Sequence, residues 1–203
     1  MNKIVTTQEL IDILKKIASK IEMHEEELTD LDRQIGDGDH GTNLKRGFHE
    51  LLPILESSSN KTTTELLNSC SMIMMSKVGG SSGPLLATAF MRMAKETELN
   101  KMLLAAAEGI KMRGKAAVGE KTMLDVLEPF AKTFDELLQK GENSKSALEK
   151  ALKVAYDSKE SIKNKPATKG RASYLGERSV GIVDPGSQSM YYILETLVEN
   201  YND

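Results

Sequence analysis

The chain has 203 residues, of which 39% are hydrophobic and 28% are charged, and its formal net charge is −3. Such a composition is typical of a globular protein with a sizeable core, and we expect one domain over residues 1–203. The weak negative charge argues against binding to nucleic acid or to an anionic membrane. Because the sequence shows neither a signal-peptide core nor an apolar stretch of about 18 residues, we expect a cytoplasmic protein.

The first predicted element is an amphipathic helix. Over residues 10–21 the apolar side chains recur at the 3.6-residue spacing of one helical face. Thr6 and Glu9 have the spacing of a capping box, in which each side chain accepts a hydrogen bond from the other residue's backbone N–H. A second helix is predicted at about 43–55.

Another capping box, Thr62 with Glu65, precedes the next apolar run and predicts a third helix. Cys70 lies within this run, and as the single cysteine of the chain it is expected to pack rather than to react. The neighbouring methionines are also expected in the core: Met72, Met74 and Met75.

The remaining helices are predicted at about 84–95, 100–112, 123–140, 144–163 and 185–201. Pro129 lies inside one of them and either kinks it or marks its start. Asp184 and Pro185 match the N-cap and the first position of the last helix. Since alternating β-branched and aromatic residues do not occur, the predicted fold class is all-α.

Glycine-rich polar segments connect several of these helices, at 35–43, 78–84, 113–122 and 169–186. In an up-and-down bundle alternate connections lie at the same end, so helix N-termini from different parts of the chain could meet there. The last segment is also rich in lysine and arginine, a charge suited either to a polyphosphate or to an acidic partner.

Three familiar motifs fit these segments only in part. Gly36, Gly38 and Gly41 match the dinucleotide-binding fingerprint, but a helix rather than a strand precedes them. As a calcium-binding EF-hand loop the same segment lacks the required glycine and glutamate. Residues 114–122 approach a Walker A loop, but Glu120 interrupts it and no strand leads in. These three interpretations are therefore rejected.

Asp32, Asp37 and Asp39 place three carboxylates within eight residues. Such groups repel one another unless a cation lies between them, and Mg²⁺ prefers hard oxygen ligands together with phosphate oxygens and waters. Thr42 and Asn43, at the start of the next helix, would offer N–H groups to a phosphate. The alternative is that aspartate and glycine merely form turns and caps. A second loop of glycine and serine nearby in the chain favours a metal–phosphate site over that alternative.

Four segments carry a family resemblance: "LDRQIGDGDHGTNLKRGF", "VGGSSGPLLATAF", "VGEKTMLDVLEPF" and "GRASYLGERSVGIVDPGS". In this order they resemble the motifs of the nucleotide-binding L subunit of bacterial dihydroxyacetone kinases. The resemblance implies a barrel of about eight antiparallel amphipathic helices, in which loops at one end hold ADP or ATP and two Mg²⁺ ions.

The same resemblance implies roles for individual residues. The implied magnesium ligands are Asp32, Asp37 and Asp39. The implied phosphate contacts are His40, Gly41, Thr42, Asn43, Ser81 and Ser82. The implied nucleotide pocket and its closing segment contain Gly114, Met123, Arg171, Asp184, Pro185 and Gly186. Two positions depart from the family pattern: Glu120 replaces an aspartate, and Ile182 stands where relatives usually carry histidine.

The implied activity is phosphoryl transfer. Because a fused kinase would carry a further substrate domain, the length is similar to that of the stand-alone form that serves the phosphotransferase system. In that form ADP stays bound as a coenzyme, a phosphohistidine on an M subunit rephosphorylates it, and dihydroxyacetone on a K subunit accepts the phosphoryl group. Two alternatives remain open: an ADP-loaded regulatory module acting on a transcription regulator, and a paralogue with another triose acceptor.

Overall fold

The computed structural model describes residues 4–201, and within that range it contains nine α-helices and one 3₁₀ helix. The only β-type pairing in the described range is a single bridge between Ile4 and Glu98, so the predicted all-α class is confirmed. The helices are α1 (Thr7–Met23), α2 (Glu25–Ile35), α3 (His40–Glu56), α4 (Thr63–Lys77), α5 (Ser82–Met93), α6 (Leu99–Gly114), α7 (Leu124–Gln139), α8 (Ser144–Lys163), η1 (Arg171–Ser179, the 3₁₀ helix) and α9 (Pro185–Glu199).

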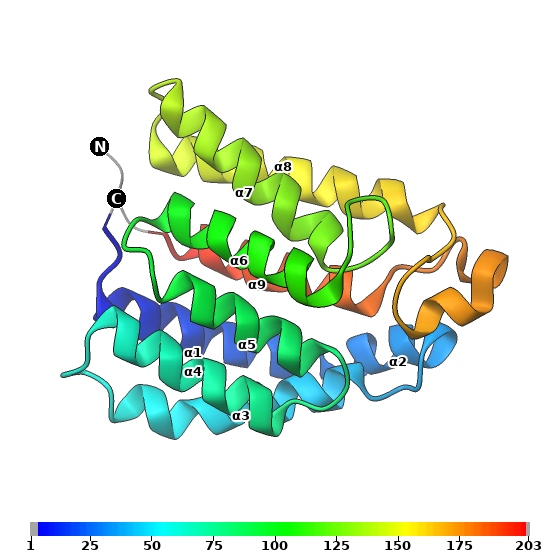
Figure 1. Ribbon diagram of the computed structural model, residues 1–203, viewed down its shortest axis with the longest axis horizontal. Coiled ribbons are helices and arrows are strands. Elements are labelled where there is room, and N and C mark those ends of the chain that lie inside the picture. Colours follow the sequence, from blue (N-terminus) through cyan, green and yellow to red (C-terminus); the bar gives the residue numbers. More distant parts are fainter. Residues whose placement is uncertain (1–3, 202–203) are drawn as a thin grey trace.

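Eight of these helices form a closed ring. Each of α1, α3, α4, α5, α6, α7, α8 and α9 packs on the next in this order, and α9 returns to pack on α1. Helix α2 follows α1 after a break at His24 and packs on α3, α9 and η1. The ring therefore agrees with the helical barrel that the motifs imply (Figure 1).

Local hydrogen bonds show why several helices begin where predicted. The Thr6–Glu9 and Thr62–Glu65 capping boxes both form, and they start α1 and α4. Asp184 caps α9 by accepting a 2.7 Å hydrogen bond from the Ser187 N–H. These signals are local in the sequence, so the sequence alone predicts them.

Pro129 neither starts nor ends α7, which begins five residues earlier, at Leu124. A proline has no N–H for the carbonyl four residues before it, here that of Asp125. The Ser158 hydroxyl of α8 donates to this carbonyl at 2.6 Å instead. The lost helical hydrogen bond is thus replaced from the neighbouring helix.

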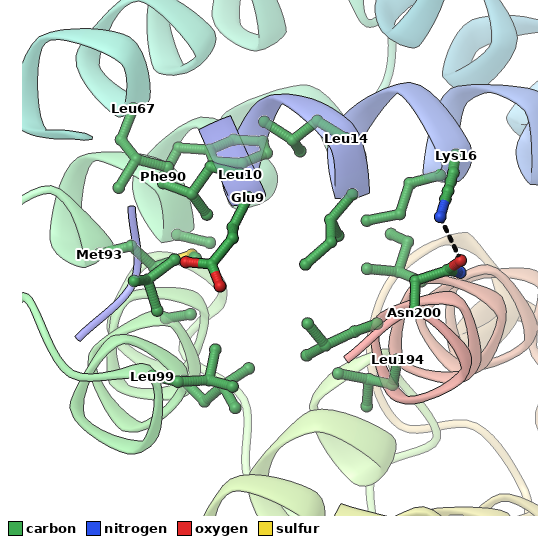
Figure 2. Close-up of a pocket in the computed structure, with 18 of the residues that line it drawn as sticks. Glu9, Leu10, Leu14, Lys16, Leu67, Phe90, Met93, Leu99, Leu194 and Asn200 are labelled. Carbon is green, nitrogen blue, oxygen red and sulfur yellow. Dashed lines mark hydrogen bonds between the residues drawn. The ribbon is translucent and has the colours of Figure 1, made fainter. Parts of the chain in front are cut away.

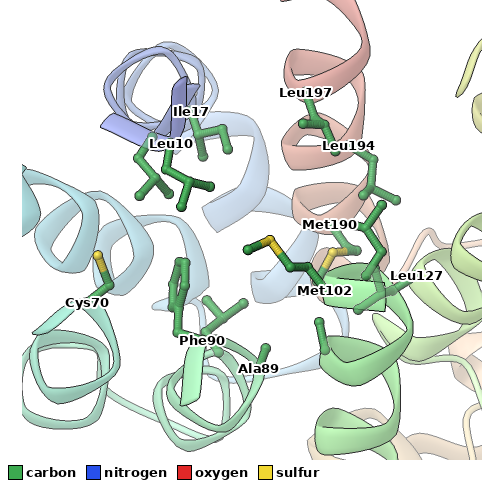
Figure 3. Close-up of a cluster of buried hydrophobic side chains, with 14 of the residues drawn as sticks. Leu10, Ile17, Cys70, Ala89, Phe90, Met102, Leu127, Met190, Leu194 and Leu197 are labelled. Atoms are coloured by element: carbon green, nitrogen blue, oxygen red, sulfur yellow. The ribbon is translucent and has the colours of Figure 1, made fainter. Parts of the chain in front are cut away.

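One hydrophobic core fills the ring, and every helix of the ring contributes to it. Figure 3 shows part of this core, with labelled side chains from α1, α4, α5, α6, α7 and α9. Cys70 and Met74 are fully buried, as expected. The prediction for Met72 and Met75 is wrong, because 68% and 50% of their surfaces are exposed. Helix α4 carries apolar residues around most of its circumference, so their spacing does not reveal which face turns inward.

The connections alternate between the two ends of the ring (Figure 1). The glycine-rich segments that precede α3, α5, α7 and α9 all lie at one end, together with α2 and η1. An apolar cavity of about 200 Å³ lies elsewhere, between α1, α5 and α9, with Glu9, Lys16 and Asn200 among its lining residues (Figure 2). None of the helices in the described part of the chain has the length and apolarity needed to cross a membrane.

Candidate functional site

Four helix N-termini meet at one cavity. His40 begins α3, Ser82 begins α5 and Pro185 begins α9, and all three line a cavity of about 500 Å³ together with Met123, the N-cap residue of α7. The first N–H groups of a helix have no acceptor within the helix and carry partial positive charge. This end of the ring is therefore suited to bind an anion such as a phosphate.

Three carboxylates lie at the same cavity: Asp32 on α2, Asp37 in the following loop and Asp39 at the N-cap of α3. Each residue has one carboxylate oxygen in the cluster, and these three oxygens all lie within 4.8 Å of one another. Gly36 permits this approach, because a Cβ atom at that position would overlap the Asp32 carboxylate. The cluster could hold a divalent cation that prefers oxygen ligands.

The contacts of these carboxylates distinguish a metal site from a simple turn. Asp32 Oδ2 accepts hydrogen bonds from the N–H groups of Asp39 at 2.9 Å and His40 at 3.1 Å. Asp39 forms no side-chain capping hydrogen bond although it is the N-cap residue of α3. Asp37 instead lies 2.9 Å from the guanidinium of Arg171. Turn formation and capping therefore explain Asp32 but not the convergence of Asp37 and Asp39 on it.

His40 links three of the helix N-termini. Its Nε2 lies 2.9 Å from Ser189 Oγ on α9, and its Nδ1 lies 3.2 Å from Ser82 Oγ on α5. Because the Ser189 hydroxyl donates to the Gly186 carbonyl, it accepts from Nε2–H, and the Ser82 hydroxyl then donates to Nδ1. Burial lowers the pKa of His40, which favours the neutral form of its imidazole. The imidazole thus fixes the relative positions of α3, α5 and α9.

The apolar part of the cavity is lined by Leu85, Ile110, Gly114 and Met123. A Cβ atom at Gly114 would lie 3.3 Å from the end of the Leu85 side chain, so this wall is closely packed. Apolar walls beside a polar, charged mouth are typical of sites for small molecules that combine a flat ring with a charged group.

The loop that leads into α7 is held by a buried carboxylate. Asp125 is fully buried and accepts hydrogen bonds from the N–H groups of Gly119 and Thr122, the latter at 2.7 Å. Desolvation raises the pKa of Asp125, and these backbone donors oppose the rise. Glu120, one of the two departures from the family pattern, accepts from the Ala117 N–H at 2.7 Å and so closes the same loop.

A segment that we name the cap, residues 164–180, covers one side of the cavity and contains η1. Ala167 and Ala172 of the cap pack on Ile35 of α2, and Ile182 and Leu175 pack against this small cluster. Ile182, the second departure, therefore supports the cap by apolar contact. The cap places Arg171 on Asp37.

The cavity brings together nearly all of the residues that the sequence suggested. Its lining includes Asp32, Asp37, Asp39, His40, Asn43, Ser81, Ser82, Gly114, Met123, Arg171, Asp184, Pro185 and Gly186. Gly41 and Thr42 do not line it. A Cβ atom at Gly41 would overlap the Glu25 carbonyl of α2, and the Thr42 hydroxyl donates to the Glu25 carboxylate at 3.3 Å. These two residues serve the contact between α2 and α3.

Sequence reasoning did not assign roles to Lys121, Asp125 and Ser189, all of which hold the site together. Their partners are distant in the sequence, and the His40–Ser189 contact spans 149 residues. The segment "VGEKTMLDVLEPF" and the rejected Walker A resemblance both include Lys121, but neither gave it a role.

Comparison with known proteins identifies the family. A family model described as the DAK2 domain matches residues 34–199. The chain belongs to the DAK2 domain family. The resemblance expected from the four motifs is thereby confirmed at the level of the family.

Two DAK2 relatives match this chain over nearly their whole length. The Lactococcus lactis protein named "PTS-dependent dihydroxyacetone kinase, ADP-binding subunit DhaL" is 44% identical over 199 residues, which cover 96% of this chain and 98% of the relative. The Escherichia coli protein named "PEP-dependent dihydroxyacetone kinase, ADP-binding subunit DhaL" is 37% identical over 198 residues, which cover 93% and 94%.

A solved structure shares the fold. The crystal structure of the dihydroxyacetone kinase from C. freundii in complex with AMP-PNP and Mg²⁺ aligns with a TM-score of 0.72 at 22% identity. The alignment covers 99% of this chain and 35% of that chain, so this chain spans about a third of the longer kinase. The likeness confirms the all-helical fold.

Proposed function

We propose that this chain is the nucleotide-holding subunit of a dihydroxyacetone kinase that depends on the phosphotransferase system. It would bind ADP as a coenzyme, and a phosphohistidine on an M subunit would donate its phosphoryl group to the β-phosphate of ADP. The resulting γ-phosphoryl group would then pass to a hydroxyl of dihydroxyacetone held by a K subunit. The two relatives that match over more than nine-tenths of their length carry the name of this subunit.

The observation that carries the proposal is the joining of three carboxylates and four helix N-termini at one cavity of about 500 Å³. Small-molecule sites measure roughly 300–1,000 Å³, so the size suits a nucleotide. We assign Asp32, Asp37 and Asp39 to two Mg²⁺ ions because their oxygens already converge without a capping role for Asp37 or Asp39. Bound Mg²⁺ would neutralise the charge of the phosphates and of the transferring group.

The chain's own side chains would position the nucleotide. His40 holds Ser82 at the start of α5, and Ser81 and Asn43 line the cavity beside it. We assign these residues to the phosphates, together with backbone N–H groups of the first turn of α3. The Thr42 hydroxyl is bound to Glu25, and a Cβ at Gly41 would meet the Glu25 carbonyl, so at these two residues only the main chain could serve. We assign Gly114 and Met123 to the base, and Arg171 with the Asp184–Pro185–Gly186 turn to closure of the site. Residues 1–203 would act as one nucleotide-binding domain.

Phosphoryl transfer between purified components tests the proposal. The chain is mixed with its K subunit, dihydroxyacetone and catalytic amounts of the phosphorylated M donor, and dihydroxyacetone phosphate is measured with and without this chain. We expect product only when this chain, Mg²⁺ and ADP are all present, and we expect ADP to co-purify with the chain. Tight Mg·ADP binding without any transfer would favour the regulatory module, and absence of nucleotide binding would refute both functions.

A further inference from the structure

Lys121 is a buried lysine among the residues that line the cavity, but its ammonium group is bound to main-chain carbonyls of other segments. Only 1% of its surface is exposed, and its backbone adopts the left-handed conformation, with φ of 67°. Its ammonium group donates to three main-chain carbonyls: those of Lys163 at 3.0 Å, Lys165 at 3.0 Å and Ser179 at 2.6 Å. Three carbonyl acceptors use all three N–H donors of a lysine ammonium.

These carbonyls stand at the two ends of the cap. Lys163 is the last residue of α8, Lys165 lies two residues further along the chain, and Ser179 is the last residue of η1. The Lys121 side chain therefore joins the segment that leads into the cap to the segment that leads out of it. The Gly181 N–H also donates to the Lys163 carbonyl at 2.9 Å. We name the place where the two ends of the cap meet its neck.

The placement of Lys121 is itself enforced. The buried Asp125 carboxylate holds the N–H groups of Gly119 and Thr122 on either side of it. Desolvation lowers the pKa of Lys121, and the nearby Asp184 opposes that shift. The carbonyls at the C-terminal end of α8 carry partial negative charge, so a cation is favoured at this position.

We propose that Lys121 is a positioning residue that clamps the neck of the cap and thereby determines how slowly bound nucleotide leaves the cavity. The clamp keeps η1 over the cavity, where Lys169, Gly170, Arg171 and Ala172 form part of the lining. The kinetic part of this inference rests on the proposed function. The mechanical part, that Lys121 closes the cap, does not.

Trypsin tests the mechanical part without nucleotide. The cap contains Lys169, Arg171 and Arg178, after which trypsin can cleave, and opening of the cap makes these bonds accessible to the protease. Lys165 is not a cleavage site because Pro166 follows it. In Lys121→Met, which keeps most of the side-chain length but removes the charge, we expect cleavage of the cap to accelerate at least tenfold. Lys165→Met is the matched control, because it removes the same charge from an exposed side chain whose carbonyl, not its ammonium, takes part in the clamp.

The dissociation rate of Mg·ADP tests the kinetic part. Hydrogen bonds to a charged group are worth roughly one to two powers of ten in an equilibrium constant. We therefore expect nucleotide to leave Lys121→Met roughly 10- to 100-fold faster than the wild type, and to leave Lys165→Met within about threefold of the wild-type rate. Lys121→Ala should regain slow cleavage and slow release in propylammonium but not in propanol, which a general loss of packing would not produce.

The outcomes separate the two proposals. If Lys121→Met shows wild-type cleavage and wild-type nucleotide release, the clamp is refuted whatever the activity of the chain. If the wild type binds no ADP while Lys121→Met still exposes the cap, the clamp stands and the proposed function fails.

A measurement on the wild type covers the case in which the Lys121 variants do not fold. Lys121 should be among the lysines slowest to react with acetic anhydride in the native protein, and much slower than Lys165. Equal labelling of the two lysines would overturn the inference.

Discussion

Replacement of Asp37 by asparagine tests whether the acidic cluster is a cation site. Asp37 lies in an exposed loop, and its contact in this structure is with Arg171, whose side chain is 67% exposed. An exposed ion pair of this kind contributes at most about 1 kcal/mol. Loss of one carboxylate also relieves repulsion within the cluster, which amounts to about 1–3 kcal/mol for two charges 4.8 Å apart at an effective dielectric constant between those of water and a protein surface. The relief of repulsion equals or exceeds the loss of the ion pair, so we expect the unliganded variant to unfold at the same temperature as the wild type or at a higher one.

The response to Mg·ADP should differ sharply. At a ligand concentration of 100 times Kd, binding stabilises the wild type by about 2.7 kcal/mol, which is about 5–11 °C for a protein of this size. A 100-fold weaker Kd in Asp37→Asn would leave about 0.4 kcal/mol, or about 1–2 °C. Thermal unfolding followed by circular dichroism, with Mg²⁺ and ADP added separately and together, measures both quantities.

Asp30→Asn is the matched control for this experiment. Asp30 lies on α2 one half-turn before Asp32, is exposed and pairs with Arg33, and it is not part of the cluster. It removes the same charge from the same region, so it should keep the full shift. A full Mg·ADP shift in Asp37→Asn, or an equal loss in Asp30→Asn, would refute assignment of the cluster to a cation.

Four further substitutions test the surroundings of the site. Gly41→Ala should lower the free energy of unfolding by about 1–3 kcal/mol, because its Cβ would overlap the backbone carbonyl of Glu25. Gly114→Ala should lower it less, because its Cβ would meet the flexible end of the Leu85 side chain. Urea titrations that rank the two variants the other way would contradict the packing argument. Burial raises the pKa of Asp184 from 3.8 to about 6, so the folded protein binds this proton more tightly than the unfolded chain and the contribution of Asp184 to stability falls as the pH rises from about 4 to 6. Asp184→Asn keeps a side-chain oxygen that can accept the N-cap hydrogen bond of α9. In the absence of nucleotide it should therefore gain stability relative to the wild type as the pH rises through that range. If the difference in unfolding free energy between the two proteins stayed constant with pH, the carboxyl would not be desolvated. Burial lowers the pKa of His40 below 6.5, so its contribution to stability is present above pH 6.5 and is lost as the pH falls, and His40→Gln should abolish that part of the pH dependence measured by chemical unfolding.

The predictable part of the fold depends on signals within a few residues. The capping pairs Thr6–Glu9 and Thr62–Glu65 fix two helix starts, and the short segment from Asp32 to Asp39 already contains the acidic cluster. The alternation of an up-and-down ring then places the glycine-rich loops at one end without any knowledge of side-chain contacts. For this reason most of the candidate site could be read from the sequence.

The unpredicted part depends on contacts between distant segments. Lys121 reaches the Ser179 carbonyl across 58 residues, and no local pattern distinguishes it from the exposed Lys115 of the same loop. Helix η1 lies in a segment expected to be a loop. It is held in place because Ala167 and Ala172 pack on Ile35, which lies more than 130 residues earlier in the chain. Met72 shows the opposite failure, because an apolar residue in an apolar run was assigned to the core although its position on α4 faces outward.

The up-and-down ring creates an electrostatic problem at its functional end, and the structure shows how it is solved. The positive N-termini of α3, α5, α7 and α9 alternate there with the negative C-termini of α2, α4, α6 and α8, so the helix dipoles alone would largely cancel at the cavity. Two of the C-termini are covered by cations from other segments: Arg46 Nε donates to the Lys77 carbonyl at the end of α4 at 2.8 Å, and Lys121 donates to the Lys163 carbonyl at the end of α8. Helix α6 carries its own Lys111 and Arg113 in its last turn. With these carbonyls neutralised, the N-termini dominate the field at the cavity. The carboxylate of Asp32, in the last turn of α2, belongs to the cluster that would bind the cation.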